Sequence, residues 1–385
     1  MRACTILILD PQTTATYHMA LMHELRDLIS TVGGISIIEE FQKKSQPDYQ
    51  TYVGSGKLDE IMDHMDQHEI DLLIIGNLLK PGQTAAIQQR LDKRFGKGKK
   101  IAWDKIDLIL AIFEKHAQTT ESKLQIELAK LTHLGTRIAG TGMDLSRQGG
   151  GSKLARGAGE TNSEVMRRHV KEHKRRIIKQ LEKYAIMRQS QRARRKKNNQ
   201  WSIGVVGYTN AGKSSLISML GNKKVYVANK LFATLGTQAS IIHLGSQESG
   251  ESDTVIIHDT IGFIRDLPPQ LLSAFRSTLE DSIETDLIIH ALDGGDPERE
   301  IKLGIVEKIL ADINSTANQI YVITKIDTIT PEQRAALLAY PRQKPVFWVN
   351  NHTSEGKSEL IQWIKDWKGN NNRISPKDNT EAQNQ

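Results

Sequence analysis

The feature that most constrains this chain is the segment GYTNAGKS at 207–214, which follows an apolar stretch and precedes a helical one. Gly207 and Gly212 let the backbone curl so that its N–H groups face inward, and the following helix adds its positive N-terminal end. A loop of this kind holds phosphates, with Lys213 on the β- and γ-phosphates and the Ser214 hydroxyl on Mg²⁺. The segment predicts a P-loop domain with a doubly wound, mostly parallel sheet that binds a nucleoside triphosphate.

Two shorter motifs follow at the spacing that such a domain requires. Asp259 opens DTIG at 259–262, about 50 residues after the phosphate loop, where its carboxylate would hold Mg²⁺ directly or through water. The N–H of Gly262 would contact the γ-phosphate. In TKID at 324–327, the Asp327 carboxylate can accept hydrogen bonds from N1–H and the 2-amino group of guanine, and adenine lacks both donors. Together the three motifs predict a GTPase.

Three residues depart from the pattern that is common in GTPases. Thr324 stands where Asn is usual, so we expect weaker ordering of that loop, with the guanine-reading carboxylate retained. Phe263 stands where many GTPases have a water-orienting Gln, and its side chain cannot hydrogen-bond water. We therefore expect slow hydrolysis by the isolated chain, with help from a partner or an ion. Asn210 is a candidate ligand for a monovalent cation such as K⁺, and the alternative is that it only braces the loop.

The basic residues of the chain are concentrated in one segment. The whole chain has 52 Lys and Arg against 45 Asp and Glu, a net charge of +7. Residues 163–199 alone hold fourteen Lys and Arg against three Glu, a net +11, which leaves −4 for the rest. This density is typical of a surface that binds a polyanion, and we favour RNA over a merely solvated helix face. The residues expected to contact RNA, here and in a glycine-rich stretch before the segment, are Arg147, Lys153, Arg156, Arg167, Arg168, Lys171, Lys174, Arg175 and Arg176.

Composition excludes several classes of protein. With 38% apolar residues and 29 Gly in 385 residues, the chain suits two or three globular domains and is not disordered throughout. The single cysteine, Cys4, cannot form an internal disulfide, which favours a reducing compartment. No apolar run approaches the roughly 18 residues of a membrane span, and the first apolar stretch contains an Asp, unlike a signal peptide. We expect a cytoplasmic monomer without a membrane span.

The spacing of apolar residues divides the chain into four parts. We expect an N-terminal α/β domain at 1–103, an antiparallel helical hairpin with a glycine-rich loop and basic arm at 104–199, a nucleotide-binding domain at 200–369 and a disordered tail at 370–385. In the hairpin, one helix covers 105–136 and 140–159 forms the loop. A basic turn at 93–100 closes the first domain. Strands are expected at 4–9, 35–41, 72–75, 202–206, 240–244, 254–258, 287–292, 320–324 and 346–349, and two helices of the first domain at 19–30 and 58–67.

Two pairs of histidines, four residues apart, could each share a helix face: His64 with His68, and His169 with His173. Zinc needs a third or fourth ligand, and the sequence shows none nearby. We therefore expect no transition-metal site, and Mg²⁺ remains the expected metal ion.

Longer stretches around these motifs resemble one family of proteins. GYTNAGKSSL at 207–216, LFATL at 231–235 and DTIGFIRDLP at 259–268 resemble the HflX family of ribosome-associated GTPases, as do TYVGSGKLDEI at 51–61 and SRQGGGSKLARGAGET at 146–161. The resemblance implies an N-terminal α/β domain, a helical hairpin with a glycine-rich loop, and a G domain. It also implies binding to the large ribosomal subunit and its rRNA, splitting of ribosomes, and GTP hydrolysis that is slow until ribosomes stimulate it.

The resemblance also assigns residues. It makes Thr234 the Mg²⁺ ligand beside Ser214, although Thr237 is a rival because Gly-Thr-Gln stands here where the family has Asp-Pro-Thr. The expected catalytic residues are Lys213, Thr234, Asp259 and Gly262. Where the family has Ser-Ala beside the guanine, this chain has two asparagines, at 350 and 351. The expected nucleotide contacts are Gly207, Tyr208, Thr209, Asn210, Ala211, Gly212, Lys213, Ser214, Ser215, Phe232, Ala233, Thr234, Asp259, Thr260, Ile261, Gly262, Thr324, Lys325, Asp327, Asn350 and Asn351.

The function predicted is therefore a Mg²⁺-dependent GTPase that associates with the large ribosomal subunit and dissociates or remodels ribosomes. The alternative is a nucleotide-gated RNA- or ribosome-binding protein with negligible hydrolysis, motivated by Phe263 and the altered guanine pocket. A separate activity of the N-terminal domain is a third hypothesis. The altered pocket also leaves selectivity for guanine over adenine as an open alternative.

Overall fold

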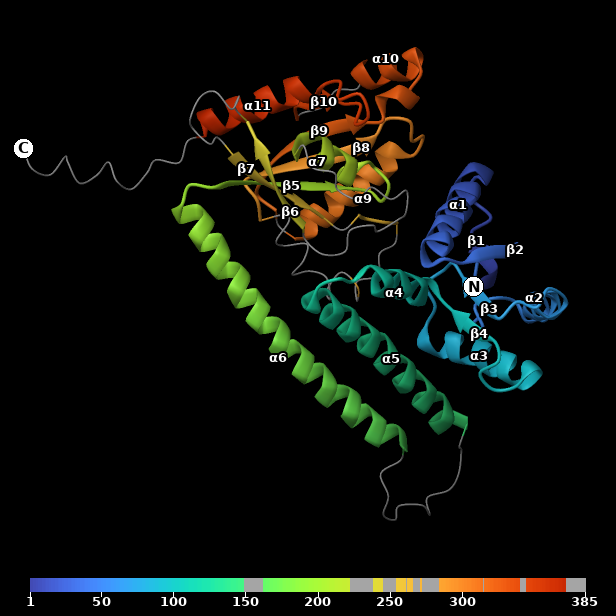
Figure 1. Cartoon of the computed structure of the whole chain (residues 1–385). Coiled ribbons are helices and arrows are strands. Elements are labelled where there is room, and N and C mark those ends of the chain that lie inside the picture. The colour runs from blue at the N-terminus through green and yellow to red at the C-terminus, as the bar shows by residue number, and fades with distance from the viewer. Residues whose placement is uncertain are drawn as a thin grey trace, which may run out of the picture. The chain divides into compact units, whose positions relative to one another are not determined.

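The computed structural model describes residues 1–148, 162–221, 238–244, 254–260, 262–265, 271, 284–313, 315–339 and 344–371. Contacts within the chain divide it into two compact units, one from Met1 to Lys183 and the other beginning at Tyr184 (Figure 1). The boundary falls inside a single long helix. Each unit is built on its own β-sheet, as the alternation of apolar and helical stretches predicted.

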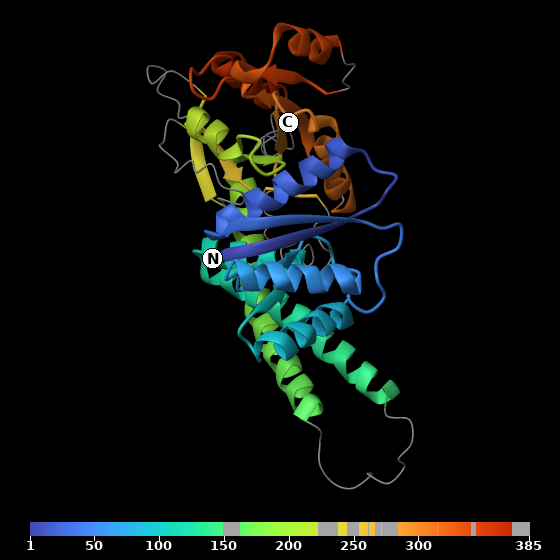
Figure 2. The same ribbon diagram turned by 90° about the vertical axis from the view of Figure 1, so that its right-hand side faces the viewer.

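The first unit contains a four-stranded parallel sheet in the order β2-β1-β3-β4. Helices α2 and α3 pack against one face of the sheet, and α1 and α4 lie on the other (Figure 2). The three predicted strands are confirmed within two residues at each end. The elements are β1 (Arg2–Leu9), α1 (Ala15–Val32), β2 (Ile35–Lys43), α2 (Ser55–Gln67), β3 (Leu72–Ile75), α3 (Pro81–Phe95), β4 (Ile101–Trp103) and α4 (Lys105–His116).

The predicted basic turn at 93–100 is wrong in its first part, because α3 continues to Phe95. Ile87 and Leu91, four residues apart, are fully buried against the sheet, and this contact holds the basic residues after them in helical conformation. The chain then returns through β4, an edge strand whose three residues are too few to give a recognisable alternation.

The helix predicted at 105–136 is two helices. After α4, the chain turns at 117–119 and begins α5 (Thr120–Gln148). The Thr119 hydroxyl accepts a hydrogen bond from the backbone N–H of Ser122 at 3.1 Å, which caps the new helix. Both helices keep the same apolar period, so the break could not be recognised from the spacing of apolar residues.

Helix α6 (Asn162–Lys197) runs antiparallel to α5, as predicted for the hairpin. Nε2 of His173 on α6 lies 3.1 Å from Oε1 of Glu127 on α5. Nearer the loop, a Cβ added to Gly135 of α5 would lie 3.7 Å from a methyl group of Val170 on α6. The predicted loop at 140–159 is wrong in its first part, because α5 continues to Gln148. Residues 149–161 lie outside the described residues.

The second unit contains a six-stranded sheet in the order β10-β9-β8-β5-β7-β6, parallel except that β6 is antiparallel to β7. Helices α7 and α11 pack on one face of the sheet, where they form a hydrophobic core with it, and α9 packs on the other face. The predicted doubly wound sheet is confirmed, with each strand within two residues of its predicted ends. The elements are β5 (Trp201–Gly207), α7 (Lys213–Gly221), β6 (Gln238–His243), β7 (Thr254–Asp259), β8 (Leu287–Asp293), α9 (Arg299–Asp312), β9 (Asn318–Thr324), the 3₁₀ turn η2 (Ile326–Thr328), α10 (Pro331–Ala339), β10 (Val346–Trp348) and α11 (Lys357–Asn370).

The tail predicted to be disordered lies mostly outside the described residues, which end at 371. Among the residues that are described, no helix is both long enough and apolar enough to cross a membrane.

Candidate nucleotide-binding site

The loop between β5 and α7 is shaped by close contact with β8, the neighbouring strand in the sheet. At Gly207, φ is +156°, and a Cβ there would lie 2.5 Å from the carbonyl oxygen of Ala291 on β8, so no larger residue fits. Asn210 and Gly212 then adopt positive φ of 63° and 79°, which turns the backbone around the position of the predicted phosphates. Lys213 begins α7 directly after this turn. The predicted strand–loop–helix arrangement is therefore present.

Lys213 is buried, and its ammonium is held by the loop that it follows. Its Nζ donates hydrogen bonds to the carbonyl oxygens of Gly207 at 3.2 Å and Tyr208 at 2.8 Å. The pKa of Lys213 is lowered to about 8, mainly by burial; the charge of Asp259 opposes this shift, and that of the neighbouring Lys325 adds to it. An anionic phosphate beside the ammonium would favour its charged form. The side chain is thus held at the position where a phosphate would be bound.

Two oxygen ligands of the type that Mg²⁺ prefers meet beside this lysine. The Ser214 hydroxyl at the start of α7 donates a hydrogen bond to Oδ2 of Asp259, at the end of β7, over 2.8 Å. Both side chains offer oxygen atoms, and an ion bound through one or two such groups would take its other ligands from phosphate and water. The two residues fit Mg²⁺. The further ligand expected at Thr234, its rival Thr237 and the neighbouring Phe232 and Ala233 lie outside the described residues.

The DTIG segment runs alongside the phosphate loop. A Cβ on Gly262 would lie 2.8 Å from Cγ2 of Thr209 and 3.0 Å from Nζ of Lys213, so only glycine fits between them. The backbone of Phe263 donates to the Gly207 carbonyl at 3.1 Å and accepts from the Thr209 N–H at 2.7 Å. The predicted phosphate-sensing glycine and the phosphate loop are therefore brought together. Ile261 lies outside the described residues.

One side chain of this segment and one of the phosphate loop make further contacts. The Thr260 hydroxyl donates to the Val205 carbonyl at 2.7 Å and is buried. The phenolic oxygen of Tyr208 accepts a hydrogen bond from the Arg265 backbone N–H at 2.6 Å. Sequence reasoning assigned Tyr208 only as a nucleotide contact and missed this link, because nothing in the motif indicates where a tyrosine at the second loop position points.

Thr324 ties the base-recognition motif to the phosphate loop. Its hydroxyl lies 2.8 Å from the Ala211 carbonyl oxygen and 3.1 Å from the Leu292 carbonyl oxygen, and it can donate to either. We expected Thr at this position to weaken the ordering of the loop, and the structure instead shows a direct, fully buried contact. The hydroxyl is short, but β9 brings it close enough to reach the loop backbone.

The remaining base-recognition residues lie at the same edge of the sheet. Nζ of Lys325 pairs with Oδ2 of Asp293 at 2.7 Å, and Asp327 is exposed in η2. Asn351 donates from Nδ2 to the Gly212 carbonyl at 3.3 Å, and its buried Oδ1 has no hydrogen-bond partner among the described residues. Asn350 is also buried, but its Oδ1 accepts from the backbone N–H groups of its own turn, at 352 and 353. Ala211 is buried and Ser215 is half-buried beside the phosphate loop.

The residues predicted to bind RNA are separated from this site in the sequence and lie mainly on α6. Lys174 is half-buried, and the side chain of Arg147, on α5, lies outside the described residues, as do Lys153 and Arg156. The exposed members of the set are Arg167, Arg168, Lys171, Arg175 and Arg176.

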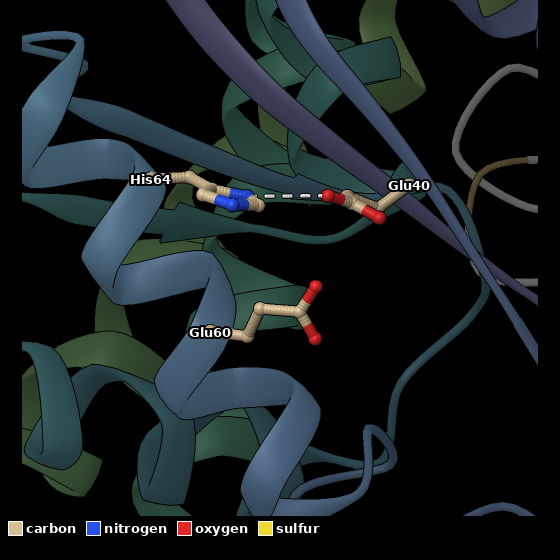
Figure 3. Close-up of side chains that lie close together, drawn as sticks. All are labelled: Glu40, Glu60 and His64. Carbon is tan, nitrogen blue, oxygen red and sulfur yellow. Dashed lines mark ion pairs between the residues drawn. The ribbon is translucent and has the colours of Figure 1, made fainter.

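The prediction that His64 has no further ligand-type neighbours is wrong. Glu60, on the same helix, and Glu40, from β2, each place a carboxylate oxygen within 4.8 Å of a His64 nitrogen and of one another (Figure 3). Nζ of Lys57, however, lies 2.8 Å from a Glu40 oxygen and 2.9 Å from a Glu60 oxygen, so an ammonium already balances both carboxylates. We interpret the group as an ion-pair cluster. Glu40 was missed because its approach depends on tertiary packing.

Comparison with known proteins covers nearly the whole chain. Three family models match it in succession: the GTP-binding GTPase N-terminal region over residues 19–114, the GTP-binding GTPase middle region over 116–195, and the 50S ribosome-binding GTPase domain over 202–326. The GTPase HflX of Caldanaerobacter subterraneus is 40% identical over 80% of this chain and 69% of that protein. That of Escherichia coli is 31% identical over 89% of this chain and 77% of that protein. The chain belongs to the HflX family of GTPases.

A solved structure supports the same conclusion about the HflX fold. The complex of SsGBP with GDP superimposes with a TM-score of 0.52 at 25% sequence identity, covering 96% of this chain and 99% of that chain. The expected family and the expected fold class, an α/β architecture with a P-loop GTPase domain, are confirmed.

We predict that Thr324→Val lowers the free energy of unfolding by about 1–3 kcal/mol, because the buried carbonyls of Ala211 and Leu292 lose their shared donor. Denaturant unfolding followed by tryptophan fluorescence measures the change. Thr328→Val is the matched control: its hydroxyl donates to the Lys325 carbonyl in an exposed turn, and we expect a change within about 0.5 kcal/mol. Equal effects of the two substitutions would contradict the assigned role of Thr324.

Proposed function

We propose that this member of the HflX family is a Mg²⁺-dependent GTPase that binds the large ribosomal subunit and dissociates or remodels ribosomes. The observation that carries the proposal is the convergence of the buried Lys213 ammonium with the Ser214–Asp259 pair beside a glycine-shaped loop. Such a set of groups suits a triphosphate with its metal ion. Family membership supports the choice of GTP.

The hydrolysis site consists of groups that stabilise charge. Lys213 neutralises the β- and γ-phosphates, and the loop N–H groups and the α7 N-terminus bind their oxygens. Ser214 and Asp259 would hold Mg²⁺, directly or through water, together with Thr234 as the resemblance implies; the ion neutralises phosphate charge when bound. Gly262 contacts the γ-phosphate through its N–H. We propose that the nucleotide contacts are those predicted from the sequence.

Slow hydrolysis without a partner follows from the environment of Phe263. Its side chain is 1% exposed and carries no hydrogen-bonding group, and its backbone is bound to the phosphate loop. No group at this position can orient the attacking water. We propose that binding to the ribosome supplies the missing stabilisation, so that turnover is fast only on the large subunit.

The exposed cations of α6 support rRNA as the ligand of the helical arm. Arg167, Arg168 and Lys171 lie within five residues and are exposed, as are Arg175 and Arg176. Closely spaced cations on a helix attract the phosphates of RNA at long range and contact them directly once RNA is bound. We propose that this face binds rRNA, and that the protein acts as a cytoplasmic monomer.

The first test is GTP hydrolysis, measured as phosphate release with and without purified large ribosomal subunits. We predict stimulation of the wild type, and a loss of about 100-fold or more in stimulated turnover for Lys213→Ala, because a clamp on the developing charge is removed. Lys308→Ala, which removes an exposed lysine on α9, is the control and keeps its turnover. Full stimulated turnover in Lys213→Ala would contradict the catalytic assignment. Nucleotide-dependent binding to subunits without turnover would support the alternative of a gated RNA-binding protein.

The second prediction concerns the base. Asp327→Asn replaces two acceptors by one acceptor and one donor, which mismatches guanine and matches the N1–H and 2-oxo group of xanthine. We predict that the affinity for GDP falls by about 100-fold or more and that xanthosine diphosphate is bound in its place. Competition against a fluorescent nucleotide measures both. Asp312→Asn, an exposed position on α9, is the control, and unchanged base preference in Asp327→Asn would exclude Asp327 from base recognition.

The third prediction tests Asn210 as a ligand of K⁺. Its φ of +63° and exposed side chain suit either an ion ligand or a brace. Asn210→Gly removes the amide and keeps the backbone conformation accessible. If Asn210 binds the ion, hydrolysis by the wild type is about tenfold faster in K⁺ than in Na⁺, and Asn210→Gly loses this preference. The same ratio of rates in both proteins would favour the brace.

A further inference from the structure

The basic residues at the C-terminal end of α6 fall into two groups, one half-buried and the other exposed. Within the second unit, half-buried side chains recur on this helix at 184, 188, 192 and 195, a spacing of four, four and three that defines one helical face. Arg194, Lys196 and Lys197 of the same turns are exposed. The arginines at 188, 192 and 195 therefore face their own unit, and the charge count of the sequence had grouped them with the RNA-binding cations.

Two of these inward arginines contact residues on either side of the DTIG segment. Nη1 of Arg195 lies 3.2 Å from Nε2 of His258, the residue that precedes Asp259 on β7. Arg192, three residues earlier in α6, forms an ion pair with Glu284. In the sequence, the stretch from Asp259 to Glu284 contains DTIG and ends three residues before β8. One turn of α6 thus contacts His258, directly before DTIG, and Glu284, which lies 22 residues after Gly262 and from which the chain leads into β8.

The Arg195–His258 contact has a defined direction. A guanidinium has only donors, so Nε2 of His258 accepts and Nδ1 carries the proton. Burial, together with the charge of Arg195, lowers the pKa of His258 to about 4, so the imidazole is neutral. Nδ1 of His258 has no hydrogen-bond partner among the described residues. Among these residues, Arg195 is therefore the group that fixes the orientation of the buried imidazole.

His258 precedes, on the same strand, the carboxylate that is expected to hold the metal ion. His258 pairs with Gly204 in the ladder between β7 and β5, and the next pair is Asp259 with Val205. The Asp259 side chain points to the opposite face of the strand and contacts Ser214. His258 is thus separated by one peptide unit from Asp259, whose carboxylate binds Ser214. A shift of the His258 backbone would therefore change the position of that carboxylate.

The end of α6 is also joined to the phosphate loop through the backbone. After α6, the N–H of Gln200 bonds to the Arg195 carbonyl at 3.0 Å, and Asn199 adopts a φ of +50°. This tight C-terminal turn leads directly into β5, whose last residue is Gly207. The helix therefore has a short backbone connection to the phosphate loop and side-chain connections to the DTIG segment.

We propose that Arg195 and Arg192 are positioning residues that couple polyanion binding along the exposed face of α6 to the geometry of Asp259 and Gly262. The inference rests on the proposed function, in which α6 binds rRNA. RNA contacts on the exposed face fix the last turns of the helix. Arg195 transmits that constraint to His258, beside Asp259, and Arg192 transmits it to Glu284, before β8. Because coupling between sites is reciprocal, the nucleotide state also alters the affinity of α6 for the subunit.

The test compares Arg195→Ala with Arg194→Ala, which removes the same charge from the same turn at an exposed position. Phosphate release is measured alone and across a titration of purified large subunits, and subunit affinity is measured with GDP and with a non-hydrolysable GTP analogue. We expect Arg195→Ala to keep its intrinsic rate within about twofold and to lose about tenfold in stimulated kcat, with the difference in affinity between nucleotide states reduced in parallel. We expect Arg194→Ala to raise the subunit concentration that gives half-maximal stimulation and to keep the stimulated kcat.

Conservative variants separate coupling from folding. Arg195→Lys retains a donor to His258, and His258→Gln retains an acceptor for Arg195, so both keep more of the stimulated kcat than Arg195→Ala. The coupling is overturned if Arg195→Ala keeps full stimulation, if it lowers intrinsic and stimulated rates equally, or if Arg194→Ala loses the same stimulated kcat. A wild type that is not stimulated and binds subunits equally in both nucleotide states overturns the proposed function itself, and the coupling with it.

Discussion

The G domain depends on holding the charged Lys213 ammonium at a buried position. Burial of an ammonium is unfavourable, as the lowered pKa of Lys213 shows, and it is tolerated because the carbonyls of Gly207 and Tyr208 accept its hydrogen bonds and Asp259 attracts it. These partners exist only while the loop keeps its turned backbone. The loop keeps that backbone because Gly207 lies against β8 and Gly262 lies against Thr209 and Lys213. These contacts hold the ammonium at a defined position, and a charge that is held in place needs little reorganisation to stabilise a bound phosphate.

Each motif of the site is held by contacts with another motif. Phe263 pairs its backbone with Gly207 and Thr209, and the Thr324 hydroxyl reaches the Ala211 carbonyl. The carbonyl ends of the parallel strands lie at one edge of the sheet, so segments more than 100 residues apart in the chain meet within hydrogen-bonding distance. The residues predicted to recognise the base are therefore joined to the phosphate loop by hydrogen bonds. This mutual support explains why Thr suffices where Asn is usual: strand position, more than side-chain length, brings the hydroxyl to the loop.

The sequence was sufficient to predict features that depend on local pattern or on the fixed geometry of a motif. The strands and the turned loop between β5 and α7 belong to this group, because alternation and motif spacing determine them. Ser214 and Asp259, both assigned to Mg²⁺ from the sequence, lie within hydrogen-bonding distance of each other. The break between α4 and α5 was missed, because Thr119 caps a helix without interrupting the apolar period. The approach of Glu40 to His64 and of Arg195 to His258 was missed because each joins separate elements. A count of charges also cannot distinguish an arginine that faces solvent from one that faces the sheet.

That distinction changes the physical meaning of the basic helix. A helix whose cations all faced solvent could bind RNA without affecting the G domain, since surface charges a Debye length away are screened. In α6 the cations are divided, and the inward face makes a part-buried contact with His258 that salt screens less than it screens exposed charges. A helix is stiff along its axis, and its last turn is joined by three residues to the strand that ends at the phosphate loop. Restraint of the outer face therefore restrains the inner face, so in the proposed coupling a single helix both binds the polyanion and influences the position of the Asp259 carboxylate.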